Sequence, residues 1–176
     1  MEGRKPGSYK WYEIQDAVDY YEEFEKPKIC WGNLCTCSPF THTGEVVFIN
    51  APACIISTDD FYLLGIINSK LMWYFLSEIA AGRRGGFIEA KPIYVQQLPI
   101  RTINFNNPSE KAIHDKLVSL VEKMLELNKK KTSLPPSAER EKIEREIAVT
   151  DEKIDEIVYE LYGITDEEKK IIVHDS

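Results

Sequence analysis

The sequence predicts an α+β fold, in which a lobe with a small mixed sheet is followed by an antiparallel helical hairpin. Short runs of β-branched and aromatic residues, separated by proline and glycine, recur through the first part of the chain. Two long stretches with apolar residues at helical spacing fill the last part. The 176 residues suffice for one domain with a substantial core and an appendage. We therefore expect a loose segment at 1–10, the α+β lobe at 11–107, and the hairpin with a short terminal helix at 108–176.

Strands are expected wherever β-branched and aromatic residues cluster between turn-forming residues. Asp16–Glu25 is ambiguous between helix and loop, and Gly32–Gly44 is expected to be a long polar loop. The expected strands are Trp11–Ile14, Lys28–Trp31, Glu45–Asn50, Ala53–Ser57, Phe87–Ala90 and Tyr94–Pro99.

Two helices are expected within the lobe. Thr58-Asp59-Asp60 has the composition of a helix start, with Thr58 or Asp59 as the N-cap, and the first helix continues through Ile67. The second runs from about Ser69 to Ala81 and ends at Gly82, because glycine is the common residue after a helix C-terminus.

After a linker at Asn104–Ser109, the pattern becomes fully helical and predicts an antiparallel hairpin with heptad-like seams. Lys129–Lys131 closes the first long helix, Leu134–Ser137 forms the turn, and Gly163 ends the second helix before a short terminal one. The seam residues are Ile113, Leu117, Leu120, Met124 and Leu127 on one helix, and Ile143, Ile147, Thr150, Ile154, Ile157 and Leu161 on the other.

The net charge of −7 argues against a generally basic nucleic-acid-binding protein. The charge is distributed unevenly, because residues 1–107 carry 10 basic and 12 acidic side chains and residues 108–176 carry 12 and 17. Within 82–101, by contrast, Arg83, Arg84, Lys91 and Arg101 oppose Glu89 alone, a local net charge of +3. The densest positive patch therefore lies in the lobe, and the helical part is acidic.

The most informative segment is the loop at 82–91, where two arginines and three glycines occur together. Arginine offers a planar fork of donors for phosphate or guanine. Gly85 and Gly86 allow the backbone to approach a ligand closely and to adopt left-handed angles. This composition predicts a docking place for an anion on an otherwise acidic protein.

No membrane segment is expected from the apolar runs of the chain. The longest are Tyr62–Ile67 and Leu71–Leu76, far below the roughly 20 apolar residues that a span needs. No apolar stretch follows Met1–Lys5, so no signal peptide is expected, and a cytoplasmic location is the default.

The cysteines raise the question of a metal site. Cys30, Cys35, Cys37 and His42 could supply four zinc ligands, but the Cys-x-Cys spacing does not match a known finger. A cytosolic chain would keep its thiols reduced, so we expect free cysteines and no metal.

Several motifs occur in the order found in the C-terminal specificity domain of TaqI-like adenine-N6 DNA methyltransferases, which this chain resembles. The matching stretches are Lys26–Ile29, Leu63–Leu71 (LLGIINSKL), Arg84–Phe87, Gln97–Ile100 (QLPI) and Ile154–Thr165 (IDEIVYELYGIT). Together they cover most of residues 11–170.

The resemblance implies a target-recognition module that binds double-stranded DNA sequence-specifically in a restriction-modification system. The implied catalytic domain, in cis or in trans, would bind S-adenosylmethionine and carry an Asn-Pro-Pro-Tyr motif. That motif is absent here, since Asn107-Pro108-Ser109 is the nearest string, so no catalytic residue and no cofactor are expected in this chain. Candidate DNA contacts are Arg83, Arg84, Gly85, Gly86, Phe87, Asn33 and Thr41, with Lys28, Lys91 and Arg101 as lower-ranked phosphate contacts.

Two other functions remain open at this point. Asp59 or Asp60 with Glu89 and Lys91 imitates the carboxylate and lysine set of a Mg²⁺-dependent nuclease. Alternatively, the helical hairpin could make the chain a protein-interaction module, or could simply cover the lobe.

Overall fold

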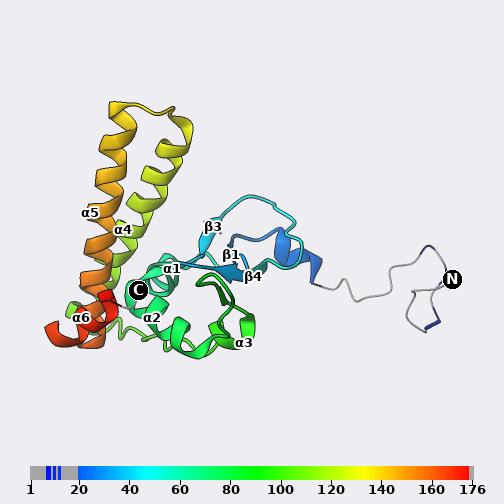
Figure 1. Cartoon of the computed structure of the whole chain (residues 1–176), viewed down its shortest axis with the longest axis horizontal. Coiled ribbons are helices and arrows are strands. Elements are labelled where there is room, and N and C mark those ends of the chain that lie inside the picture. The colour runs from blue at the N-terminus through cyan, green and yellow to red at the C-terminus, as the bar shows by residue number, and fades with distance from the viewer. Residues whose placement is uncertain (1–6, 9, 11, 13–19, 175–176) are drawn as a thin grey trace.

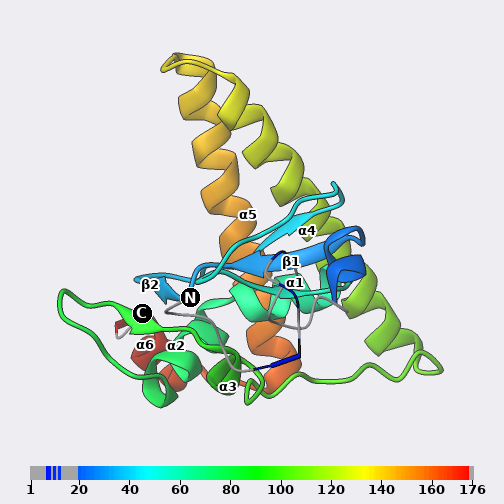
Figure 2. The same cartoon turned by 90° about the vertical axis from the view of Figure 1, so that its right-hand side faces the viewer.

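The computed structural model describes residues 7–8, 10, 12 and 20–174 of the chain (Figure 1). Two long helices, α4 (Pro108–Ser133) and α5 (Ala138–Tyr162), stand side by side as an antiparallel hairpin. The strands and shorter helices gather around the lower half of this hairpin, so that its tip extends beyond them (Figure 2). The α+β class and the helical hairpin are therefore confirmed.

The described strands form two small sheets, both antiparallel. In the first, β1 (Lys28–Trp31) lies between β3 (Thr41–Thr43) and β4 (Cys54–Ile56). In the second, β2 (Leu34–Cys35) pairs with β5 (Ile88–Glu89), so that Leu34 lies opposite Glu89. The indole of Trp31 donates to the carbonyl of Ala90 at 2.6 Å and thereby connects the two sheets.

The strands expected at β1, β4 and β5 are confirmed, but other expectations were wrong. Glu45–Asn50 forms no strand, because both edges of β1 are already occupied by β3 and β4, and Val46 and Phe48 are exposed. Gly32–Gly44 is not a continuous loop, since it contains β2 and β3.

Three further expectations concern other segments of the lobe. Tyr94–Pro99 is not a strand, because Pro92 begins a short helix, α3 (Pro92–Val95), at a position that proline favours. The ambiguous segment Asp16–Glu25 includes a 3₁₀ helix, η1 (Tyr21–Phe24). The strand expected at Trp11–Ile14 falls, apart from Tyr12, outside the described residues.

The caps of the lobe helices differ from expectation in two places. Helix α1 (Phe61–Asn68) is capped by Asp60, rather than by Thr58 or Asp59, and the Asp60 carboxylate accepts from the Leu63 amide at 3.0 Å. Helix α2 (Lys70–Ile79) begins after the cap Ser69 and ends before Gly82, because the backbone is already extended at Ala80. That extension allows Ala81 to accept from the amide of Glu89.

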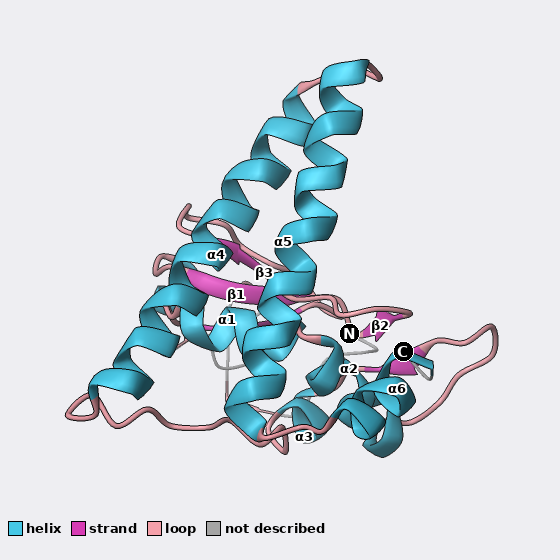
Figure 3. Ribbon diagram, turned by 90° about the vertical axis from the view of Figure 1, so that its left-hand side faces the viewer, coloured by secondary structure: helices cyan, strands magenta, loops and turns pink. Residues whose placement is uncertain are grey.

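The hairpin helices begin and end where the sequence indicates. Asn107 caps α4, Ser137 caps α5, and Gly163 ends α5 in the left-handed conformation with a φ of 68°. Thr165 and Glu168 exchange hydrogen bonds at the start of α6 (Asp166–His174), as in a capping box. Helix α6 folds back beside α2 at the base of the hairpin (Figure 3).

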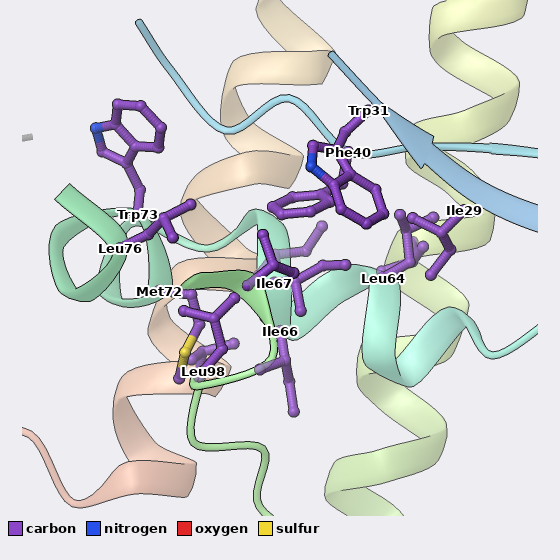
Figure 4. Packing of buried hydrophobic residues seen from close by; sticks show 14 of the residues in the cluster. Ile29, Trp31, Phe40, Leu64, Ile66, Ile67, Met72, Trp73, Leu76 and Leu98 are labelled. Atoms are coloured by element: carbon purple, nitrogen blue, oxygen red, sulfur yellow. The ribbon is translucent and has the colours of Figure 1, made fainter. Parts of the chain in front are cut away.

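One core runs from the lobe into the hairpin. Ile66 and Met72 from the lobe helices are as fully buried as Leu117 and Val158 from the hairpin. Figure 4 shows Ile66, Ile67, Met72, Leu76 and Leu98 converging between the helices, with Trp31 and Phe40 packed under the sheet. Helix α1 approaches α4 closely at Gly65, where a Cβ added to the glycine would lie 2.8 Å from Cγ2 of Val121.

Within the described residues, no helix combines the length and the apolar character needed to cross a bilayer.

Candidate nucleic-acid interface

The glycine-arginine loop joins the end of α2 to β5 and projects beyond the paired strands β2 and β5 (Figure 3). Its base is closed by a bridge between Gly82 and Ile88 and by the Arg83 amide, which donates to the Phe87 carbonyl at 2.6 Å. At its tip, Gly85 and Gly86 have φ angles of 81° and 78°. These angles strain any residue with a Cβ, so the glycines are required to reverse the chain and present the neighbouring arginines.

Glu89 pairs with one arginine of this loop and with Lys91, which follows β5, so that one carboxylate organises two of the three neighbouring cations. Oε1 of Glu89 accepts from Nε and Nη2 of Arg83 at 2.9 and 2.6 Å, and Oε2 lies 2.6 Å from Nζ of Lys91. The side chain of Glu89 is 13% exposed, whereas that of Arg83 is 52% exposed. Arg84 is exposed, and no described residue forms a hydrogen bond or ion pair with its side chain. It is thus the loop cation that is free for an external anion.

We expect Glu89 to titrate below its ordinary pKa of 4.5, because hydrogen bonds from Lys91 and then Arg83 stabilise its carboxylate. The ion pairs then stabilise the loop above that pH and are lost as the pH falls through the lowered pKa. An NMR titration that follows the side-chain carboxyl carbon of Glu89 would measure this lowered pKa. Lys91→Ala and Arg83→Ala should each raise the pKa of Glu89 toward 4.5, because each removes a hydrogen bond and a positive charge. An unchanged pKa in both variants would contradict the geometry.

Comparison with known proteins assigns the family. A model of the TaqI-like C-terminal specificity domain matches residues 4–100, which is more than half of the chain and includes the whole loop. The chain belongs to this family. The type II restriction enzyme and methyltransferase RM.Eco57I of Escherichia coli is 33% identical over 113 residues. The alignment covers 63% of this chain and 11% of that much longer relative.

Among the other candidate contacts of this specificity domain, Phe87 belongs to the loop and the rest lie apart from it. Phe87 is 42% exposed beside the glycines, where it could touch a base. Thr41 is exposed on β3, at the edge of a cleft of about 800 Å³ between the lobe and the hairpin. Asn33 is half-buried, its amide oxygen lies inside the protein, and its backbone carbonyl accepts from Ala90. Arg101 is exposed, but it lies beyond α3.

Lys28 is placed by the structure inside the specificity domain. Its side chain is fully buried, and Nζ donates to the carbonyl of Glu45 at 3.0 Å. The ammonium therefore holds the 44–50 segment against the sheet and cannot reach a phosphate. For this reason Lys28 does not belong to the proposed contact surface.

Cys30, Cys35, Cys54 and His42 lie on strands of the two sheets, whereas Cys37 is exposed. Burial raises the pKa of the thiols of Cys30, Cys35 and Cys54, which disfavours the thiolate that binds metals. His42 packs edge-on against Phe61, and its Nε2 lies 2.8 Å from Oδ1 of Asp59. Across the described ranges, no three His, Cys, Asp or Glu side chains converge as metal ligands would.

The carboxylates of the nuclease alternative already have structural partners. Asp60 caps α1, Asp59 lies against His42, and Glu89 is held between Arg83 and Lys91. A metal-binding nuclease centre needs carboxylates that converge on one ion. In the structure, these carboxylates instead cap a helix or form ion pairs with His42, Arg83 and Lys91.

Two tyrosines that sequence patterns did not single out fix the QLPI segment. The hydroxyl of Tyr162 donates to the Pro99 carbonyl at 2.6 Å and accepts from the Arg101 amide at 3.0 Å. Tyr62 donates to the Arg101 carbonyl at 2.9 Å, and burial raises the pKa of Tyr62 to about 12, which keeps this hydroxyl protonated. Tyrosine in place of phenylalanine on an apolar helix face was the available signal.

Proposed function

We propose that this specificity domain is the DNA target-recognition module of a restriction-modification adenine-N6 methyltransferase, which binds double-stranded DNA sequence-specifically. The observation that carries this proposal is the projecting loop at 82–87, on which Arg84 is unpaired and Arg83 is held outward. The Escherichia coli relative, a type II restriction enzyme and methyltransferase, supports the same class.

The catalytic steps belong to a separate domain in this proposal. A methyltransferase part, in cis or in trans, would bind S-adenosylmethionine and flip the target adenine out of the duplex. The specificity domain would contribute no cofactor site and no catalytic residue. A cytoplasmic location follows from access to DNA.

We also propose that the hairpin at 108–176 serves assembly, while the lobe at 11–107 serves recognition. The hairpin segment carries a net charge of −5 from its 12 basic and 17 acidic residues, which repels DNA phosphates. Its tip extends beyond the lobe (Figure 2), and the cleft of about 800 Å³ between the middle of the hairpin and the lobe is lined in part by the apolar side chains of Met124 and Ile147. These features suit contact with the methyltransferase part.

The double variant Arg83→Ala/Arg84→Ala tests the recognition role. We expect weaker binding to a pool of short random-sequence duplexes, because two cations leave the DNA-facing loop. The slope of log affinity against log salt should become shallower by about 1–2. Fluorescence anisotropy across a salt series would measure both quantities.

The matched control also removes two positive charges, but from the hairpin and not from the loop. Lys129 and Lys130 are exposed near the hairpin tip, so Lys129→Ala/Lys130→Ala should leave affinity and slope nearly unchanged. Equal effects of the two double variants would indicate a non-specific charge effect. If the loop variant binds with unchanged affinity and salt slope, the loop does not contact DNA.

A further inference from the structure

The guanidinium of Arg83 has one edge occupied and another free. Nε and Nη2 both donate to Oε1 of Glu89, at 2.9 and 2.6 Å. Nη1 makes no hydrogen bond to any described residue, and Nη2 retains a second proton. The side chain is 52% exposed. The two terminal nitrogens can therefore present a pair of parallel donors to a ligand at the loop surface.

Glu89 is itself held firmly enough to orient this fork. Its backbone belongs to β5, opposite Leu34, and its amide donates to the carbonyl of Ala81 at 3.0 Å. Its second carboxylate oxygen is bound by Lys91 at 2.6 Å, and its side chain is only 13% exposed. A long side chain that is restrained before binding loses less conformational entropy on binding.

Its neighbour Arg84 lacks this support. It is exposed at the tip of the loop, and no described side chain holds its guanidinium. A freely moving cation can follow a phosphate but has no defined direction for reading a base edge.

We propose that Arg83 reads a guanine in the major groove, that Glu89 is the positioning residue for Arg83, and that Arg84 contacts the phosphate backbone. Guanine presents two acceptors, O6 and N7, to a pair of parallel donors. Adenine presents an acceptor beside a donor, which a guanidinium cannot satisfy. This division of roles rests on the proposed function, namely that the loop meets DNA.

The same carboxylate favours discrimination over general affinity. Arg83, Arg84 and Lys91 carry three positive charges, and the negative charge of Glu89 cancels one of them. Glu89 also forms ion pairs with both Arg83 and Lys91. Non-specific attraction to phosphates is thereby reduced, and the direction of Arg83 is preserved. Glu89→Gln should consequently raise affinity for arbitrary DNA, steepen its salt dependence and weaken base discrimination.

The experiment begins with selection of preferred duplexes from a random pool by the 176-residue chain. Affinities are then measured for the selected duplex and for versions in which each G·C pair is replaced by A·T. At one of these G·C pairs, we expect Arg83→Lys to lower the affinity ratio of the G·C duplex over its A·T version about tenfold or more. Lysine retains the positive charge but lacks the planar pair of donors. The salt slope of this variant should match that of the unmodified chain. Arg84→Lys should retain both properties.

Each result decides a separate statement. Loss of the G·C preference in Arg84→Lys, with retention in Arg83→Lys, would overturn the assignment of the two arginines. Unchanged discrimination in Glu89→Gln would overturn the positioning role, even if the salt slope steepens through the lost negative charge. An unchanged thermal midpoint shows that a variant remains folded, so a loss of discrimination alone cannot be a stability effect. If the unmodified chain selects no sequence and the Arg83→Ala/Arg84→Ala variant binds equally well, the proposed function itself fails.

Discussion

Asp155→Ala is expected to lower the free energy of unfolding by about 3 kcal/mol, because it leaves a partly buried lysine without its counter-charge. The carboxylate of Asp155 on α5 is 5% exposed and lies at the start of α2. Oδ1 accepts from the backbone amide of Lys70 at 2.8 Å, and Oδ2 accepts from Nζ of the same residue at 2.7 Å. One side chain of the hairpin thus satisfies both a helix N-terminal amide and an ammonium of the lobe.

The pH dependence of this pair has a defined sign. Burial acts to lower the pKa of Lys70, but the hydrogen bond and charge of Asp155 outweigh it, and the pKa rises above 10.5. The stabilisation is therefore fully present below 10.5 and is lost as the pH rises through the raised pKa. Asp155→Ala should remove that part of the alkaline loss.

Urea unfolding followed by circular dichroism would measure the effect, with Asp155→Asn and Glu156→Ala as companions. Asparagine keeps an acceptor for the amide but loses the charge, so its effect should be intermediate. Glu156 lies next to Asp155 on α5 and pairs with Lys169, but its side chain is 63% exposed, so Glu156→Ala should change stability little. An Asp155→Ala variant as stable as Glu156→Ala would show that the contact does not hold the lobe to the hairpin.

Gly65→Leu should also cost about 3 kcal/mol, through crowding between α1 and α4. A Cβ at this position would meet Val121 Cγ2 at 2.8 Å and Leu117 Cδ1 at 3.1 Å. Neither neighbour can move away easily, because Leu117 is fully buried and a β-branched residue in a helix has one preferred rotamer. Gly65→Ala should cost less, because its side chain ends at Cβ and its helix propensity, about 1 kcal/mol better than that of glycine, offsets part of the crowding.

A double-mutant cycle separates crowding from other causes. Val121→Ala alone should destabilise by leaving a cavity, but it should partly rescue Gly65→Ala by making room for the new methyl group. The coupling would appear in the unfolding free energies of the single and double variants. If the two changes are simply additive, close approach at Gly65 is not what sets the helix spacing.

The Asp155 contact supports the proposed recognition role, because α2 leads toward the glycine-arginine loop. Its N-terminus is held by Asp155, and its last turn is followed by the strand-like bond from Glu89 to Ala81. The loop is thus mounted on a helix that is anchored to the hairpin at its other end. A recognition loop on a rigid support retains the geometry of its contacting side chains.

Prediction from sequence succeeded for segments whose conformation depends on near neighbours. The apolar spacing in 108–176 predicted α4 and α5, and Ser137 and Gly163 mark the ends of α5 as expected. It was wrong for Glu45–Asn50, where the residues favour a strand but no partner edge is available. The strands β2 and β3 were missed because β2 has only two residues, and the three residues of β3 are all polar.

For the candidate interface, composition identified the loop but not the arrangement of its charges. The glycines and arginines at 82–86 were recognisable because their chemistry is local. Lys28 resembled an ordinary surface cation in the sequence, yet its stem is enclosed and its ammonium is bound by the backbone of Glu45. The DNA-contacting roles of the remaining residues stay predictions.

The sequence by itself determined the two long helices, the end of α5 at Gly163 and a glycine turn preceded by arginines, because hydrogen bonds within four residues and left-handed glycine angles are properties of short segments. Only the tertiary structure decided which cation is available. The pairing of β5 with β2 and the end of α2 brings Glu89 between Arg83 and Lys91 and leaves Arg84 unpaired. Such an arrangement depends on segments far apart in the chain, whose meeting is set by the packing of the common core.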